Sequence, residues 1–265
     1  MATRQEPRAI VIGAGVAGIA LASRLKLDLN FSNFTIYERE ESIGGTWFLN
    51  TYPGVGCDVD SHLYSYSFNP NPYWSKRFAE QKEILQYLYD TADKFDVRSH
   101  VKTQIEVVKA EWIEARLLWK VTLRDMTNKR EFVREAEILV SCVGTISVPK
   151  DCDIPGHKSF KGTIYHSARW NHLDNMKGKT VAVVGNGCSA AQLMPYVVQN
   201  AQKVYQFQRS AQWINERPNR EFTSFEKWCF RYLPFWQKAY RFWICSYKSR
   251  PSYRIKKTLL TSVLE

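Results

Sequence analysis

The sequence has few of the residues that build metal centres or disulfide frameworks. Its 265 residues include six cysteines and five histidines. No two cysteines form a CxxC pair, and the histidines lack the spacing of a zinc site. We therefore expect no bound metal, and we interpret the cysteines as reduced thiols of a cytoplasmic protein. The sequence also contains no Ser-His-Asp constellation, internal repeat or low-complexity segment.

Long apolar runs are missing as well. A membrane span needs about 20 mostly apolar residues, and charged residues interrupt even the most aromatic part of the chain too often to allow one. Residues 1–7 are polar, so we predict neither a signal peptide nor a transit peptide there. Hydrophobic residues make up 45% of the sequence, which is ample for the core of one or two domains.

A glycine-rich turn near the N-terminus carries the first functional signal. Gly13, Gly15 and Gly18 stand at the spacing of a dinucleotide-binding fingerprint. The turn follows an apolar stretch, Arg8 to Ile12, that predicts a strand, and helical apolar spacing runs from Val16 to Leu27. The glycines permit the tight turn, the approach of a phosphate and close helix packing. We expect a pyrophosphate at the helix N-terminus.

The residue that ends the next strand indicates which dinucleotide this turn binds. Phe34 to Tyr37 predicts a strand that ends at Glu38, about 20 residues after the turn, where the fingerprint places an acid. A carboxylate accepts hydrogen bonds from ribose hydroxyls and repels a 2′-phosphate. The first site therefore fits NAD or the adenosine half of FAD.

A second glycine-rich turn repeats this arrangement with one difference. A predicted strand, Lys179 to Val184, precedes the turn, the helix runs from Cys188 to Gln199, and the next strand runs from Lys203 to Gln208. That strand is followed by Arg209, not by an acid. A charged hydrogen bond to a 2′-phosphate contributes roughly 1.5–3 kcal/mol, which corresponds to about 10- to 150-fold preference for NADP.

Two longer motifs lie between the turns and are more specific than either of them. The first runs from Gly45 through Trp47 and Tyr52-Pro53-Gly54 to Asp58, and the second is Phe160-x-Gly162-xxx-His166-xxx-Trp170. They resemble the two signatures of the Baeyer–Villiger monooxygenases, flavoproteins that use FAD, NADPH and dioxygen. Asn171, where the family usually has Pro or Asp, is the one departure. The resemblance spans roughly residues 8–218.

The resemblance implies roles for residues at matching positions. It implies FAD contacts, NADP contacts and two tentative catalytic residues, Asp58 and His166, of which His166 would couple nicotinamide binding to domain movement. The implied FAD contacts are Gly13, Gly15, Gly18, Glu38, Thr46, Trp47, Asp58, Tyr64 and, more weakly, Ile105. The implied NADP contacts are Gly56, Cys57, Asp58, Gly185, Asn186, Gly187, Cys188, Ser189, Ala190, Ala191, Gln192, Arg209 and Ser210.

The resemblance also implies a reaction. NADPH would reduce the flavin, the reduced flavin would react with oxygen, and the resulting peroxyflavin would attack a ketone to give an ester or lactone. The protein would supply binding, orientation and electrostatics. No position of this chain corresponds to the arginine that stabilises the peroxyflavin in the family. The sequence therefore supports cofactor binding more strongly than turnover.

These signals together predict an α/β protein with two Rossmann-like dinucleotide-binding domains, FAD first and NADP second. We expect the FAD domain at residues 1–150, an inter-domain linker at 151–178, an incomplete NADP domain at 179–219 and a basic aromatic helical segment at 220–265. Within the FAD domain we predict a helix over 79–95, a β-meander inserted over 103–140 with a turn at 125–128, and a buried strand over 138–143.

The C-terminal segment is unusual in composition. Residues 221–265 interleave eleven aromatic residues between 222 and 247 with nine Lys and Arg residues, against three Glu. The resemblance implies a helical insertion that buries these rings, part of which we expect to be exposed. Basic aromatic helices also lie in membrane interfaces, which stays a minority alternative, and we expect no nucleic-acid partner.

Three functional hypotheses remain open. The leading one is a Baeyer–Villiger monooxygenase acting on a ketone, with a bulky natural-product intermediate of secondary metabolism as a weakly favoured substrate. A flavin monooxygenase that oxidises nitrogen or sulfur is a second hypothesis, against which Trp170 argues. The third is a non-catalytic nucleotide-binding remnant or interaction module, supported by the incomplete second domain.

Overall fold

The computed structural model describes residues 6–212 and 217–248 of the chain. The chain divides into two compact units, and each is described by itself. The first unit comprises residues 1–55 and 84–212, and the second comprises residues 56–83 and 213–265. The predicted division into cofactor domains follows other boundaries, and it stays a prediction.

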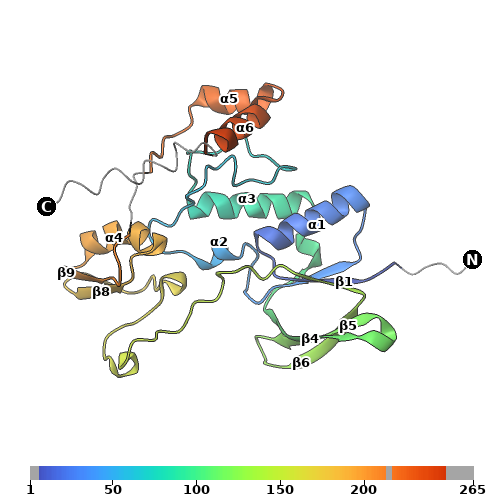
Figure 1. Cartoon of the computed structure of the whole chain (residues 1–265), viewed down its shortest axis with the longest axis horizontal. Helices are drawn as coiled ribbons and strands as arrows, with labels where there is room; N and C mark the ends of the chain where they lie inside the picture. The colour runs from blue at the N-terminus through green and yellow to red at the C-terminus, as the bar shows by residue number, and fades with distance from the viewer. Residues whose placement is uncertain (1–5, 213–216, 249–265) are drawn as a thin grey trace, which may run out of the picture. The chain divides into compact units, whose positions relative to one another are not determined.

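The first unit is built on a parallel sheet. Its strands are β1 (Ala9–Ile12), β2 (Phe34–Tyr37), β3 (Val101–Lys102) and β7 (Ile138–Ser141), in the order β3-β2-β1-β7. Helices α1 (Val16–Leu29) and α3 (Gln81–Lys94) lie on one side of this sheet (Figure 1). In the register, Ile10 stands beside Thr35 and Leu139. The predicted β1-α1-β2 arrangement is confirmed.

The prediction for β7 was wrong in one respect. The apolar stretch from residue 138 was expected to be a buried strand ending at Val143, but β7 ends at Ser141 and Ile138 is 41% exposed. The physical reason is position, because β7 pairs only with β1 among the described residues and so forms an edge of the sheet.

The predicted meander covers the other side of the sheet. It consists of β4 (Ile105–Ile113), β5 (Leu118–Asp125) and β6 (Glu131–Ala136), all antiparallel. The turn between β5 and β6 is held by the Asp125 carboxylate, which accepts a hydrogen bond from the Thr127 backbone at 2.8 Å. The meander and the sheet bury one cluster together, formed by Ile10, Tyr37, Val121, Leu123 and Ala136.

The second glycine turn also lies in the first unit. It is flanked by a parallel pair of strands, β8 (Thr180–Val184) and β9 (Lys203–Phe207), and by helix α4 (Cys188–Asn200). The sheet has these two strands alone within the described residues, as expected for an incomplete domain. The remaining short helices of this unit are α2 (Thr46–Leu49), η1 (Arg98–His100), η2 (Glu114–Arg116), η3 (His157–Ser159) and η4 (Ser167–Arg169).

Helices α5 (Ser224–Tyr232) and α6 (Trp236–Lys248) lie within the described residues of the second unit. A capping box starts α5, because Thr223 accepts from the Glu226 backbone and Glu226 accepts from the Thr223 backbone. Both helices pack around His62, whose ring centroid lies 4.2 Å from that of Phe230 and 5.2 Å from that of Tyr240. In the part of the chain that the structure describes, neither these nor other helices have the length and apolarity to span a bilayer.

Candidate functional site

The first glycine turn is held tightly between β1, β2 and α1. Gly13 has φ +95°, and its backbone N–H donates to the Tyr37 carbonyl at 2.8 Å. A Cβ at Gly18 would lie 2.0 Å from the Gly13 carbonyl oxygen. The third glycine therefore allows α1 to cross directly over the end of β1, as the fingerprint predicts.

A second glycine pair packs against this turn. A Cβ on Gly45 would lie 2.9 Å from the Gly15 Cα, and the Gly44 N–H donates to the Ala14 carbonyl at 3.0 Å. Gly45 precedes α2, whose first two residues are Thr46 and Trp47. The fold thus brings two predicted FAD contacts next to Gly15, although the Trp47 side chain itself is buried.

Glu38 lies at the same edge of the sheet and connects three segments. One carboxylate oxygen accepts from the Ala14 N–H at 2.7 Å, and the other accepts from the Glu40 N–H at 2.9 Å. The Ile105 N–H donates to the Glu38 carbonyl at 2.9 Å. A carboxylate offers about four lone pairs, so Glu38 keeps acceptor capacity for ribose hydroxyls.

The electrostatics of this turn suit an anion. The N-cap of α1 is Gly15, with no side-chain cap and no acidic residue in the first turn of the helix. A helix N-terminus carries about half a positive charge. The uncapped N-terminus of α1 is suited to the pyrophosphate of a dinucleotide.

The second turn is more open than the first. Gly187 is the N-cap of α4, again with no side-chain cap and no acidic residue in the first turn. A Cβ on Gly185 or Gly187 would meet nothing within 4 Å. Asn186 fixes the turn by donating to the Ser210 carbonyl at 2.6 Å and the Gln208 side chain at 3.0 Å. Arg209 follows β9 between these two partners and is exposed, in the position predicted for binding a 2′-phosphate.

The Tyr52-Pro53-Gly54 segment of the first motif contacts helix α4, which follows the second turn. Sequence reasoning missed this contact. The Tyr52 hydroxyl donates to Gln192 at 2.8 Å and lies 3.2 Å from the Ser189 hydroxyl. Gly54 has φ +82°, and a Cβ there would lie 2.5 Å from the Gln192 carbonyl oxygen. Tyr52 is also part of a buried cluster with Leu193 and Val197. The motif glycine and tyrosine therefore have a packing role on α4.

The next residues of the motif belong to the second unit. Cys57 is buried, and burial raises the pKa of its thiol, so its sulfur is suited to packing and not to redox chemistry. The Arg217 guanidinium donates to the Cys57 carbonyl at 3.0 Å. Sequence reasoning missed Arg217, which lies close to Gly56 as well. Asp58 is exposed and Tyr64 is half-buried in this unit.

The histidine of the second motif is held by its own loop. His166 Nδ1 accepts from the Ala168 N–H at 3.1 Å and caps the short helix η4. The ring is exposed, and because Nδ1 is the acceptor, the proton of the neutral ring lies on Nε2. Trp170 packs edge-on against Tyr165, with ring centroids 5.3 Å apart. Trp170 therefore anchors the segment that presents His166.

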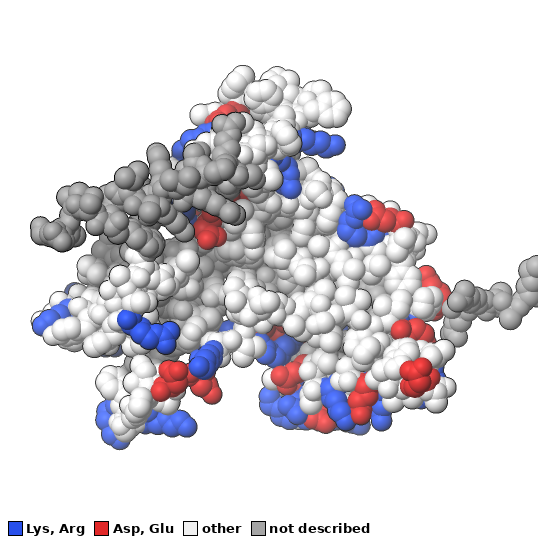
Figure 2. Space-filling view, viewed as in Figure 1, with Lys and Arg blue, Asp and Glu red and all other residues white. Residues whose placement is uncertain are grey.

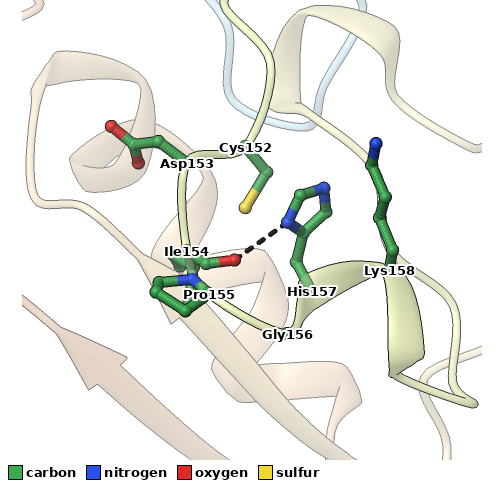
Figure 3. A pocket seen from close by; sticks show the side chains of 7 residues that line it. All are labelled: Cys152, Asp153, Ile154, Pro155, Gly156, His157 and Lys158. Carbon is green, nitrogen blue, oxygen red and sulfur yellow. Dashed lines mark hydrogen bonds between the residues drawn. The ribbon is translucent and has the colours of Figure 1, made fainter.

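The described part of the first unit includes the following two hollows. One has a volume of about 310 Å³ and is formed by the segment from Cys152 to Lys158 (Figure 3). In it the His157 Nδ1–H donates to the Ile154 carbonyl at 2.9 Å. The other has a volume of about 570 Å³ and includes Ile105 with Tyr37 and Arg134 in its lining. Neither hollow is lined by the glycine turns.

Comparison with known proteins identifies the family. The model of a family described as flavin-binding monooxygenase-like matches residues 6–226. A Baeyer–Villiger monooxygenase of Streptomyces coelicolor is 40% identical over 228 residues, which are 86% of this chain and 42% of that protein.

Solved structures give the same picture. OTEMO in complex with FAD and NADP is 33% identical with a TM-score of 0.77, and the match covers 85% of this chain and 43% of that one. A closed cyclohexanone monooxygenase is 30% identical with a TM-score of 0.77, covering 88% and 44%. The chain thus spans less than half the length of these relatives. By the match over residues 6–226, the chain belongs to the flavin-binding monooxygenase-like family.

Proposed function

We propose that the first glycine turn binds FAD. The proposal is carried by the geometry at the ends of β1 and β2, where Gly15 borders the uncapped N-terminus of α1 and Glu38 faces the same turn. An acid at Glu38 favours ribose hydroxyls over a 2′-phosphate. The similarity to OTEMO, which is solved with FAD, supports the choice of FAD over NAD.

The second turn is proposed to bind NADPH. Open space at Gly185 and Gly187 leaves room for phosphates, and the exposed Arg209 supplies a cation at the end of β9. The NADP contacts proposed on α4 are Cys188, Ser189, Ala190, Ala191 and Gln192. Tyr52 holds two of them, Ser189 and Gln192, by hydrogen bonds.

The reaction proposed is Baeyer–Villiger oxygenation, in which one oxygen atom of O₂ is inserted next to a ketone carbonyl. FAD and NADPH would supply the redox chemistry when bound, and the chain's residues bind and orient them. The names of the relatives support a ketone substrate, and a bulky natural-product intermediate is the substrate we favour. His166 and Asp58 are proposed to act near the nicotinamide.

Flavin binding and reduction test the proposal. Purified protein mixed with FAD should retain it through gel filtration, and NADPH should bleach the bound flavin anaerobically, faster than NADH does. A chain that takes up no FAD would refute the first assignment. Flavin that is retained but stays oxidised would favour the nucleotide-binding remnant, and oxygenation of an amine or sulfide in place of a ketone would favour the other monooxygenase class.

The Arg209→Ala variant tests the second site. The variant should weaken NADPH binding by about 10-fold or more and leave NADH binding unchanged, because a charged hydrogen bond contributes roughly 1.5–3 kcal/mol. Lys203→Ala is the matched control, since it removes an exposed cation at the other end of the same strand. Equal losses of NADPH affinity in the two variants would contradict the role of Arg209.

A further inference from the structure

The two helices of the second unit present aromatic side chains to solvent. On α5, Phe225, Trp228 and Tyr232 recur at helical spacing, and Phe225 is 71% exposed. On α6 the corresponding residues are Trp236, Trp243 and Tyr247. Soluble monomers rarely expose large contiguous apolar patches without a binding role. We call these six residues, with Phe235 and Phe242, the aromatic surface.

Each helix also carries buried side chains, Cys229 and Phe230 on α5 and Ile244 on α6. The helices are therefore already anchored by one face. The rings of the aromatic surface are exposed although these side chains are buried, and they need their own explanation.

The charged residues of the two helices are mostly basic. Residues 224–247 contain four Lys and Arg residues and a single acid, Glu226, which forms an ion pair with Arg220 at 2.7 Å. The exposed Lys238 ammonium lies 5.8 Å from the Phe235 ring centroid, and the exposed Arg231 guanidinium lies 5.7 Å from that of Tyr232. Figure 2 shows the surface over α5 and α6, at the top of the view, as mostly uncharged, with Lys and Arg groups and an acidic group at its borders.

We propose that the aromatic surface binds an anionic lipid bilayer, with α5 and α6 lying in the headgroup region. Trp and Tyr are enriched at membrane–water interfaces, and helices with one apolar and one basic face lie in the plane of the interface. The cations at the border supply charge complementarity to anionic headgroups, each contributing about fivefold in affinity. Helices of this length bind on the bilayer and do not cross it. This binding goes beyond the proposed function and is independent of it.

Two other occupants fit less well. A second copy of the chain would bring like charges together across the same face. Single-stranded nucleic acid needs open ring faces on which bases stack. The rings instead stack on one another along each helix, as Phe225 does on Trp228 at 6.2 Å and 14° and Trp243 does on Tyr247 at 5.7 Å and 19°.

Vesicle flotation with the full 265-residue chain tests the proposal. The chain should float with phosphatidylcholine vesicles that contain about one-third phosphatidylserine and bind pure phosphatidylcholine at least about 10-fold more weakly. Added salt should release it. Equal binding to both vesicles, or no binding to either, would overturn the proposal.

A triple variant tests the rings. Phe225→Gln, Phe235→Asn and Phe242→Gln remove three exposed rings and should reduce binding at least about 10-fold, since apolar burial drives insertion. Asn is chosen at residue 235 because its φ is +64°, which Asn tolerates. The matched control is Leu29→Gln, Ile146→Thr and Leu173→Gln, which removes three exposed apolar side chains of the first unit and should leave binding unchanged.

A charge variant and two further measurements complete the test. Arg231→Gln with Lys238→Gln should lower binding to anionic vesicles about 25-fold, and should change binding to neutral vesicles little.

Retained FAD in every variant would separate a failure of the lipid proposal from a failure of the proposed function. Self-association lost in the triple variant would show that a second copy occupies the surface, and stronger binding of a single-stranded RNA than of vesicles would assign it to nucleic acid. Either result would overturn the proposal.

Discussion

At the scale of single residues, the third glycine of the first turn, Gly18, and the second glycine of the second turn, Gly187, have different physical roles. Gly18 is confined, because a Cβ there would lie 2.0 Å from the Gly13 carbonyl oxygen. Gly187 is unconfined, because its φ is −69° and a Cβ there would meet nothing within 4 Å. Substitution by alanine should therefore lower stability at Gly18 and lower NADPH binding at Gly187.

Gly18→Ala should lower the free energy of unfolding by about 3 kcal/mol, since backbone atoms cannot move aside for the methyl group. Gly187→Ala should change the free energy of unfolding by less than about 1 kcal/mol, because its φ suits alanine but alanine is a poorer N-cap than glycine. It should weaken NADPH binding at least about 10-fold, because the methyl group fills space proposed for phosphate. Urea unfolding and NADPH titration measure both quantities. A Gly187→Ala protein with unaltered NADPH affinity would contradict the proposed second site.

Residues also show where sequence reasoning ended. Glu38 could be predicted because the spacing from Gly18 is fixed by one strand and one helix. The contacts of Tyr52 with Gln192 and of Arg217 with Cys57 could not, because their partners lie 140 and 160 residues apart. No periodicity within one segment encodes such a contact. It follows from how the segments fold together.

At the scale of elements, helices and strands were predicted best where apolar spacing alone defines them. The helix α1 and the three-stranded meander appear where expected. The exposed edge at β7 was not predicted, because an apolar run shows that a strand exists but not which strands flank it. The partial exposure of the aromatic rings on α5 and α6 was expected, and rings such as Phe225 and Phe242 are exposed.

The packing of α5 and α6 around His62 leads to a pH prediction. Burial, followed by the Arg241 charge, lowers the pKa of His62 from 6.5 to about 4. Its Nδ1 accepts a hydrogen bond from the Gln237 side-chain amide at 3.1 Å. Its Nε2 makes no hydrogen bond within the described residues. Between pH 6.5 and 4 the unfolded chain binds a proton that the folded second unit does not. Stability therefore falls as the pH falls through this window, by about 3 kcal/mol.

Unfolding by urea at several pH values measures this loss, with Trp fluorescence as the signal. His62→Phe keeps an aromatic ring and removes the titration, so its stability should be flat over the same window. Glu226 affects only the lowest part of this window, because Arg220 lowers the pKa of that carboxyl from 4.5 to about 2 and its stabilisation is lost mainly between these values. An undiminished slope in the His62→Phe protein would contradict the assignment.

At the scale of the whole molecule, the dominant property is a formal net charge of +11. FAD and NADPH are both anions, and a cationic protein attracts them before contact. The association rate of NADPH should therefore fall about 10-fold when the ionic strength rises from low to physiological values. The dissociation rate should change little, and stopped-flow fluorescence separates the two. A salt effect confined to dissociation would show that local ion pairs, and not the overall field, dominate.

The two-stranded sheet of β8 and β9 has a practical consequence for handling the protein. Both of its edges carry backbone donors and acceptors unpaired by any strand among the described residues, and Val184 and Phe207 are exposed beside them. Open edges of this kind template strand addition by neighbouring molecules. We therefore expect intermolecular β-structure to form as the protein concentration rises. Ligands that bind at the glycine turn after β8 should reduce this association.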